Sequence, residues 1–163
     1  MTRPVLKKEE IKDLSSKMNF KLTSLELELD SNGRPNRESF SSRMAELKRQ
    51  GVDFVYLGSS SFLRKNGDAF TAAAVENGLP VLSPYEHLVR KSHALMSVAA
   101  RYYDVGQLAG EQAKAILVDS KSPADLPVRS VENYAYVINM ATARKLKMFP
   151  SVAILQLADT VNK

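Results

Sequence analysis

The side chains that could do chemistry are few, and none has a catalytic spacing. His87 and His93 are six residues apart, which is not the spacing of a helical metal-binding pair, so ordinary surface histidines are expected. Glu26 and Glu28 would share one face of a strand, where a solvated face is a simpler interpretation than a catalytic pair. The chain has no cysteine, which excludes thiol chemistry and disulfides.

The standard loops for phosphates and for a serine nucleophile are also missing. The sequence contains no GxGxxG, no GxxxxGK[ST] and no GxSxG, so "GSSSF" (58–62) is not a nucleophile elbow. We therefore expect no enzyme activity, no cofactor and no metal site. A single sequence does not show spatial clusters, and a small α/β enzyme stays open as a minor alternative.

Three polar loops follow expected strands and are the better candidates for a binding site. They are "GSSSF" (58–62), "SPYEH" (83–87) and "SVAARYYD" (97–104). In open parallel sheets, ligands bind at the carboxyl ends of the strands, where helix N-termini offer free N–H groups. Together the loops supply hydroxyls, an aromatic ring, a carboxylate and a cation, which suits a small polar or zwitterionic solute.

The three consecutive serines of the first loop have a second interpretation. Serine is a preferred N-cap, so one of Ser59, Ser60 and Ser61 could cap the helix that follows. Capping and ligand contact do not exclude each other.

Composition indicates one ordinary globular domain. The chain has 163 residues, of which 44% are hydrophobic and 25% charged, with a net charge of +5. The basic residues are spread along the chain rather than gathered in a stripe with aromatic residues, so we expect no nucleic-acid partner. The charged start, "MTRPVLKKEEIKDL", does not have the apolar run of a signal peptide.

Helical and strand patterns alternate along the chain. This alternation predicts the α/β class, a three-layer parallel sheet with helices on both faces. Gly51 and Gly78 are expected to stop helices, and Asn139 is expected to be an N-cap. The expected helices cover 5–18, 37–50, 62–77, 102–117 and 140–148, with a short one in the tail, and the expected strands cover 20–30, 52–58, 79–83, 94–100 and 132–139.

Several segments resemble the substrate-binding proteins of ABC transporters, in the tryptophan- and tyrosine-type group with the type I periplasmic-binding fold. The segments are "GLPVLSPYE", "ALMSVAARYYDVGQLAGEQAKAIL", "SPADLPV", "YVINMATARKLKM" and "FPSVAILQLADTV". They keep the family's order and spacing from Val52 to the end of the chain, about two thirds of it. Each segment alone would be a weak match.

The resemblance implies two α/β lobes joined by hinge strands, with a solute trapped between them. Residues 1–163 would be the carboxy-terminal lobe, without most of the amino-terminal lobe, and 101–127 would be a crossover helix and hinge segment. The implied partners are a small-molecule solute and an ABC permease in the membrane. The implied location is periplasmic or membrane-anchored on the extracytoplasmic side.

The resemblance also assigns site residues. Ser59, Ser60, Ser61 and Phe62 would contact the ligand at a helix N-terminus, where a carboxylate would fit. Ser83, Tyr85 and Glu86 would form the second contact loop, with Glu86 as partner for a ligand amine, and Ser97 and Tyr102 would lie near the hinge. The family's glycines around "KSHALMSVAA" are missing here, which puts the geometry of the third loop in question.

Two further expectations stay open. A helix from Tyr103 to Leu117 with one apolar face would expose a stripe unless another chain covers it, which favours a homodimer through this helix. The same fold also senses small molecules in transcription regulators, so a ligand-sensing regulatory domain is the main alternative to a transport component.

Overall fold

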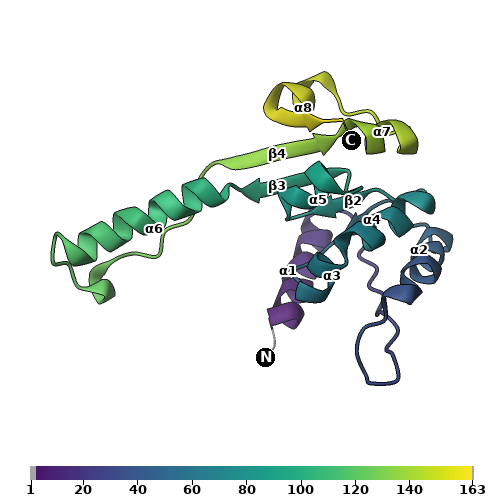
Figure 1. The fold of residues 1–163 in the computed structure, drawn as a ribbon, viewed down its shortest axis with the longest axis horizontal. Helices are drawn as coiled ribbons and strands as arrows, with labels where there is room; N and C mark the ends of the chain where they lie inside the picture. The colour runs from purple at the N-terminus through teal and green to yellow at the C-terminus, as the bar shows by residue number, and fades with distance from the viewer. Residues whose placement is uncertain (1–2, 163) are drawn as a thin grey trace.

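The protein has a central five-stranded sheet, a group of helices packed on it, and a long arm that extends away from it (Figure 1). The computed structural model describes residues 3–162. The helices are α1 (Arg3–Met18), α2 (Phe40–Arg49), α3 (Ser61–Lys65), α4 (Gly67–Glu76), α5 (Glu86–Lys91), α6 (Tyr102–Leu117), α7 (Met140–Leu146) and α8 (Val152–Leu157), with 3-10 turns η1 (Arg37–Ser39) and η2 (Pro123–Asp125). The strands are β1 (Val55–Tyr56), β2 (Val81–Ser83), β3 (Met96–Ala100), β4 (Tyr134–Asn139) and β5 (Ala158–Val161).

The strands lie in the sheet in chain order, and the pairing is mixed. The pairs β1 with β2, β2 with β3 and β4 with β5 are parallel. The pair β3 with β4 is antiparallel, and Ala100 at the end of β3 lies opposite Tyr134 at the start of β4. The α/β class is therefore confirmed, but the wholly parallel sheet is corrected to a mixed one. The reason is that the chain returns from the arm beside the point where it left.

The core lies between the sheet and the helices α2, α4 and α5. Phe40 of α2 makes edge-to-face contacts with Phe70 of α4, at 5.3 Å between ring centroids, and with Phe62 of α3, at 6.1 Å. Aliphatic side chains of β1 and β2 complete this cluster, and burying them away from water is its main stabilisation. On the opposite face of the sheet, Tyr56, Val98 and Tyr136 remain partly exposed.

The first expected strand is wrong. Residues 20–30 are extended but make only an isolated bridge, between Leu29 and Pro35. The alternation is real, since Leu25 and Leu27 are partly buried and Leu27 packs against the core. The edge strand β1 has only two residues, so it offers little ladder for a further strand to pair with.

Helix ends follow the sequence closely, with one exception. Gly51 and Gly78 adopt φ values of 75° and 69° just after α2 and α4, as expected for helix stops. The helix expected over 62–77 is two helices, because the chain bends at Asn66, which ends α3 and begins α4. The tail contains the expected helix, α8, followed by β5, which the sequence did not predict.

The arm consists of residues 101–133 and leaves the rest of the described chain, residues 3–100 and 134–162, between β3 and β4 (Figure 1). We call this remainder the lobe. Its main element is α6, which has no buried residue and makes no extensive contact with any other described helix or strand. Tyr102 is 83% exposed and Leu117 is 81% exposed. The return segment is held to α6 by an ion pair between Arg129 and Glu111 and by a hydrogen bond from Gln112 to the Pro127 carbonyl.

Asn139, at the end of β4, joins three elements through one fully buried side chain. Its Oδ1 accepts hydrogen bonds from the N–H groups of Ala141 and Thr142, at 3.0 and 3.1 Å, and so caps α7. Its Nδ2 donates to the carbonyls of Val89, at 3.1 Å, and Ser92, at 3.2 Å, at the end of α5. The expected N-cap is confirmed, and the two bonds to α5 are additional.

We predict that Asn139→Ala lowers the free energy of unfolding by about 3 kcal/mol, because it removes a cap and leaves buried backbone groups unpaired. Urea unfolding measures this loss. The matched control is Asn36→Ala, which removes a partly exposed cap with one side-chain hydrogen bond, to Glu38, and should cost about 1 kcal/mol. Equal losses in the two variants would contradict the joining role of Asn139.

Candidate functional site

The first polar loop joins β1 to α3 and divides its serines between two roles. Ser60 has an extended backbone, and its Oγ accepts a hydrogen bond from the Leu63 N–H at 3.3 Å. Ser60 is therefore the helix cap, which confirms the capping interpretation for one of the three serines. Ser59 and Ser61 are exposed on either side of it. Phe62 turns inward and packs against Phe40 in the core.

A hollow of about 580 Å³ lies between the first and second loops. It is lined by Ser61, Arg64 and Lys65 of α3 and by His87 of α5. Its volume is within the range of roughly 300–1,000 Å³ that is usual for small-molecule sites, but the hollow is open to solvent rather than enclosed. The structure therefore brings the two loops to one place at the carboxyl ends of β1 and β2, as the parallel pairing predicts. The residues that line it are hydroxyl or basic, and none is an acid.

The second loop is ordered by its own hydrogen bonds. The buried Oγ of Ser83 accepts from the Tyr85 N–H at 2.9 Å, so this hydroxyl serves the turn before α5. The ring of Tyr85 packs partly against the core and lies 5.9 Å from the ring of His87. The loop thus presents His87 to the hollow, while Ser83 holds the loop's shape.

Glu86 is already paired with a cation of its own helix. Its carboxylate lies 2.5 Å from Nε of Arg90, one turn further along α5. Arg90 also binds Asp159 of β5 at 2.9 Å, and Arg101 at the base of the arm lies 3.6 Å from the same carboxylate. The hydrogen bond with Glu86 is the main cause that raises the pKa of Arg90, so the guanidinium stays charged.

Ser97 and Tyr102 do not join the hollow. Ser97 lies on β3 directly opposite Ser83 of β2, is 1% exposed, and its Oγ has no hydrogen-bond partner among residues 3–162. Tyr102 is the first residue of α6 and points into solvent at the base of the arm. Both positions are close to where the chain leaves the lobe, and neither lines the hollow, although Ser97 is the strand neighbour of Ser83.

Sequence reasoning missed three residues near the site: Arg64, Lys65 and Tyr56. The first two follow Ser61 by three and four positions, which places them on the same side of a helix, so the pattern "SFLRK" carried a signal. Tyr56 ends β1 just before the first loop. Partial burial, and then the nearby phenol of Tyr85, raise the pKa of Tyr56 above its usual value.

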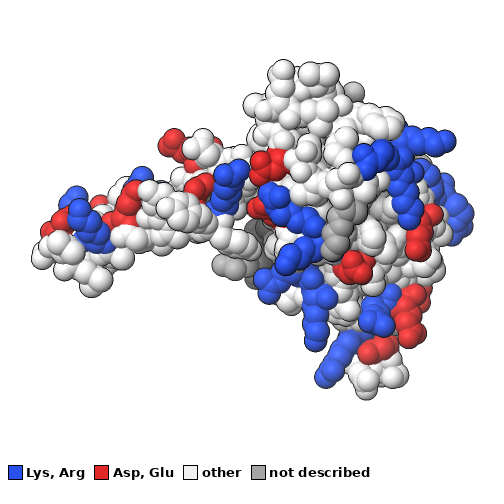
Figure 2. Space-filling model, turned by 45° about the horizontal axis from the view of Figure 1, so that its top comes forward, with Lys and Arg blue, Asp and Glu red and all other residues white. Residues whose placement is uncertain are grey.

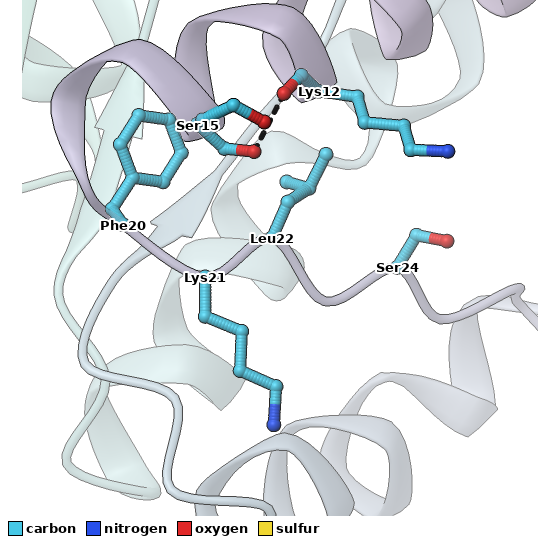
Figure 3. Close-up of a pocket in the computed structure, with 7 residues that line it drawn as sticks. Lys12, Ser15, Phe20, Lys21, Leu22 and Ser24 are labelled. Atoms are coloured by element: carbon cyan, nitrogen blue, oxygen red, sulfur yellow. Dashed lines mark hydrogen bonds between the residues drawn. The ribbon is translucent and has the colours of Figure 1, made fainter.

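A second hollow, of about 420 Å³, lies between the end of α1 and the extended segment that follows it (Figure 3). Phe20 and Leu22 supply apolar walls, and Ser15 is tied to the Lys12 carbonyl by a 2.6 Å hydrogen bond. It contains none of the predicted site residues, and we assign it no role.

Between residues 3 and 162, no three side chains of the types that bind metals lie close enough to hold an ion. Within the same range, no helix is both long enough and apolar enough to cross a lipid bilayer.

The polar loops after β1 and β2 lie at the carboxyl ends of the strands, the place where open α/β sheets commonly bind ligands. The family model for ABC transporter substrate binding proteins matches residues 4–162, and the chain belongs to this family. The resemblance noted in the sequence is thereby confirmed. No curated protein sequence matches the chain.

Three solved structures share the fold at low sequence identity. The first, a conserved domain protein from Vibrio cholerae, is 22% identical with a TM-score of 0.75 and covers 96% of this chain and 50% of its own. The second, from Streptococcus pneumonia, is an ABC domain in complex with L-Trp, 19% identical, with a TM-score of 0.74, and covers 97% and 50%. The third, from Clostridium difficile, is the ligand-free, open form of a substrate-binding protein with adhesive properties, 20% identical, with a TM-score of 0.76, and covers 99% and 51%. This chain therefore spans about half the length of each.

We predict that Tyr56 ionises above the usual tyrosine pKa of about 10. Below about pH 10 both the folded and the unfolded state keep this proton. As the pH rises further, the unfolded state ionises first, so the free energy of unfolding falls until the folded pKa is passed. The difference in tyrosinate absorbance between the native protein and Tyr56→Phe should show the late ionisation, and the variant should lack this part of the fall in stability. Tyr85→Phe should reduce the shift only partly, and ionisation of Tyr56 at or below pH 10 would contradict the prediction.

Proposed function

We propose that this chain provides one lobe of the solute-binding component of an ABC import system. The observation that carries the proposal is the hollow between the loops after β1 and β2, in a chain whose family is one of substrate-binding proteins. Such a protein holds its solute between two lobes, and closure reports the bound state to the permease. In this proposal residues 1–163 are the carboxy-terminal lobe.

In this proposal some of the predicted site residues contact the solute, and others hold the loops in shape. Ser59 and Ser61 contact the solute from the first loop, and Ser60 holds that loop in place as a cap. Ser83 and Tyr85 shape the second loop, Phe62 anchors the first to the core, and Glu86 acts through its pairing with Arg90. Ser97 and Tyr102 belong to the base of the arm, where the lobes would meet.

The arm fits the role of a crossover between lobes. The chain leaves at Ala100 and returns at Tyr134, and these residues are paired neighbours in the sheet. Two adjacent strands that leave and return together are what a hinge between two lobes needs. We propose that residues 101–127 are this crossover and hinge segment. A binding function also fits the family better than turnover, since the family is defined by substrate binding.

The transport role predicts where the protein acts. In cells that produce it, the protein should be found on the extracytoplasmic side, in the periplasm or anchored to the membrane, and should cross-link to a permease. Immunoblots of periplasmic, membrane and cytosolic fractions measure this, with a cytosolic and a periplasmic enzyme as fraction controls. A protein confined to the cytosol would remove the transport role and favour a sensing domain.

We further propose that the isolated chain forms a homodimer through α6. The face of α6 that carries Val105 and Leu117 is exposed, together with Tyr102 and Tyr103 at the start of the helix. An exposed apolar surface of this kind favours association. We propose a second copy as the partner. The chain covers half of each of these solved structures, so two copies together have about the length of one of them.

We predict that Leu117→Lys weakens this dimer, raising its dissociation constant at least about tenfold, because a charge would replace an apolar contact. Sedimentation equilibrium over a range of concentrations measures the constant. The matched control is Gln107→Lys, which adds the same charge to α6 outside the apolar face and should leave the dimer unchanged. A native chain that stays monomeric at all concentrations would refute the dimer.

A further inference from the structure

We propose that this lobe selects an anionic solute, one that carries a carboxylate or phosphate group, rather than an ordinary zwitterionic amino acid. The proposal rests on the proposed function, because it names the chemical class of the solute in the same hollow. It goes against the expectation, drawn from the sequence, that Glu86 would receive a ligand amine.

The first observation is that the cations of the hollow lack acidic partners. Arg64 and Lys65 are exposed at the wall of the hollow, and within residues 3–162 neither has an acid at ion-pair distance. The other hollow residues with polar side chains, Ser61 and His87, can both donate hydrogen bonds. A guanidinium, an ammonium and two further donors around one space match the oxygens of a carboxylate or phosphate group.

The second observation is that the acid next to His87 in the chain is already paired. Glu86 precedes His87 in the chain, and its carboxylate is held at 2.5 Å by Arg90. Arg90 is in turn held by Asp159, which fixes the guanidinium in place. A ligand amine would have to break this pairing while facing Arg64 and Lys65, whereas an anion would meet only donors. The local charge of the hollow therefore favours anions over amines.

The charge of the whole protein also favours anions. Figure 2 shows many Lys and Arg side chains on the lobe, with fewer Asp and Glu side chains among them. The chain as a whole has a net charge of +5. A net positive charge attracts anions and raises their local concentration, and this attraction weakens as salt is added.

The experiment is a nuclear magnetic resonance titration of the full chain with three probes: succinate, inorganic phosphate and tryptophan. Succinate or phosphate should shift the amide signals of residues 58–65 and 85–87 in a saturable way, and added sodium chloride should weaken the effect. The double variant Arg64→Gln/Lys65→Gln should raise the dissociation constant of that anion at least about tenfold, since it removes both charges.

The matched control removes two cations elsewhere, in Lys145→Gln/Lys147→Gln. Both lysines are exposed at the end of α7, which begins where β4 ends. Because β4 is antiparallel to β3, α7 lies at the opposite edge of the sheet from the hollow. The control should keep the anion affinity within about twofold, so that a specific site is distinguished from general charge attraction.

Three outcomes would overturn the inference. Tryptophan shifting the two loops while neither anion does so would refute anion selection but support the proposed solute-binding function. Anion shifts that spread over surface lysines and survive the double variant would indicate general attraction and refute the site. No shift of the two loops with any probe would also refute it, while the transport role would still stand or fall on the cell-fractionation result.

Discussion

The arrangement of the lobe depends on the buried side chain of Asn139. One amide caps α7 with its oxygen and holds the end of α5 with its nitrogen, so three elements meet at a group that water cannot reach. A buried amide with all of these bonds made is stable, whereas a partly satisfied one would be costly. Since α5 carries His87 to the hollow, the geometry of the candidate site is set in part from the opposite end of this short helix.

Local features of the fold could be predicted from the sequence, and long-range ones could not. Helix ends could be predicted at Gly51, Gly78 and Asn139, because the conformational and hydrogen-bonding preferences of these residues act within a few positions. The alternation in 20–30 correctly indicated that Leu25 and Leu27 face inward, but not Leu29, which is exposed, and it could not supply a neighbouring strand to pair with. The antiparallel direction of β4 could not be predicted either, because it depends on where the chain returns after the arm.

In the candidate site too, local features could be predicted from the sequence and long-range contacts could not. The sequence located the two polar loops, because parallel strands bring their carboxyl ends together, and it identified serine capping, which Ser60 performs. It assigned Glu86 to a ligand and overlooked its partner Arg90, four residues further along the same helix. The bond from Arg90 to Asp159 joins residues 69 positions apart, which local patterns do not show. Both cations of the hollow come from α3, in "SFLRK", but the sequence alone did not show that His87 of α5 lies beside them.

The placement of the arm gives the lobe a modular topology. Residues 101–133 are an insertion at the tip of an antiparallel hairpin, and Ala100 and Tyr134 close it as directly paired neighbours. The entropy of closing such an insertion rises only slowly with its length, so the sheet imposes almost no limit on how long the arm is. Relatives could therefore lengthen, shorten or replace the arm without disturbing the register of β3 and β4, and the lobe could fold before the arm finds what it packs against.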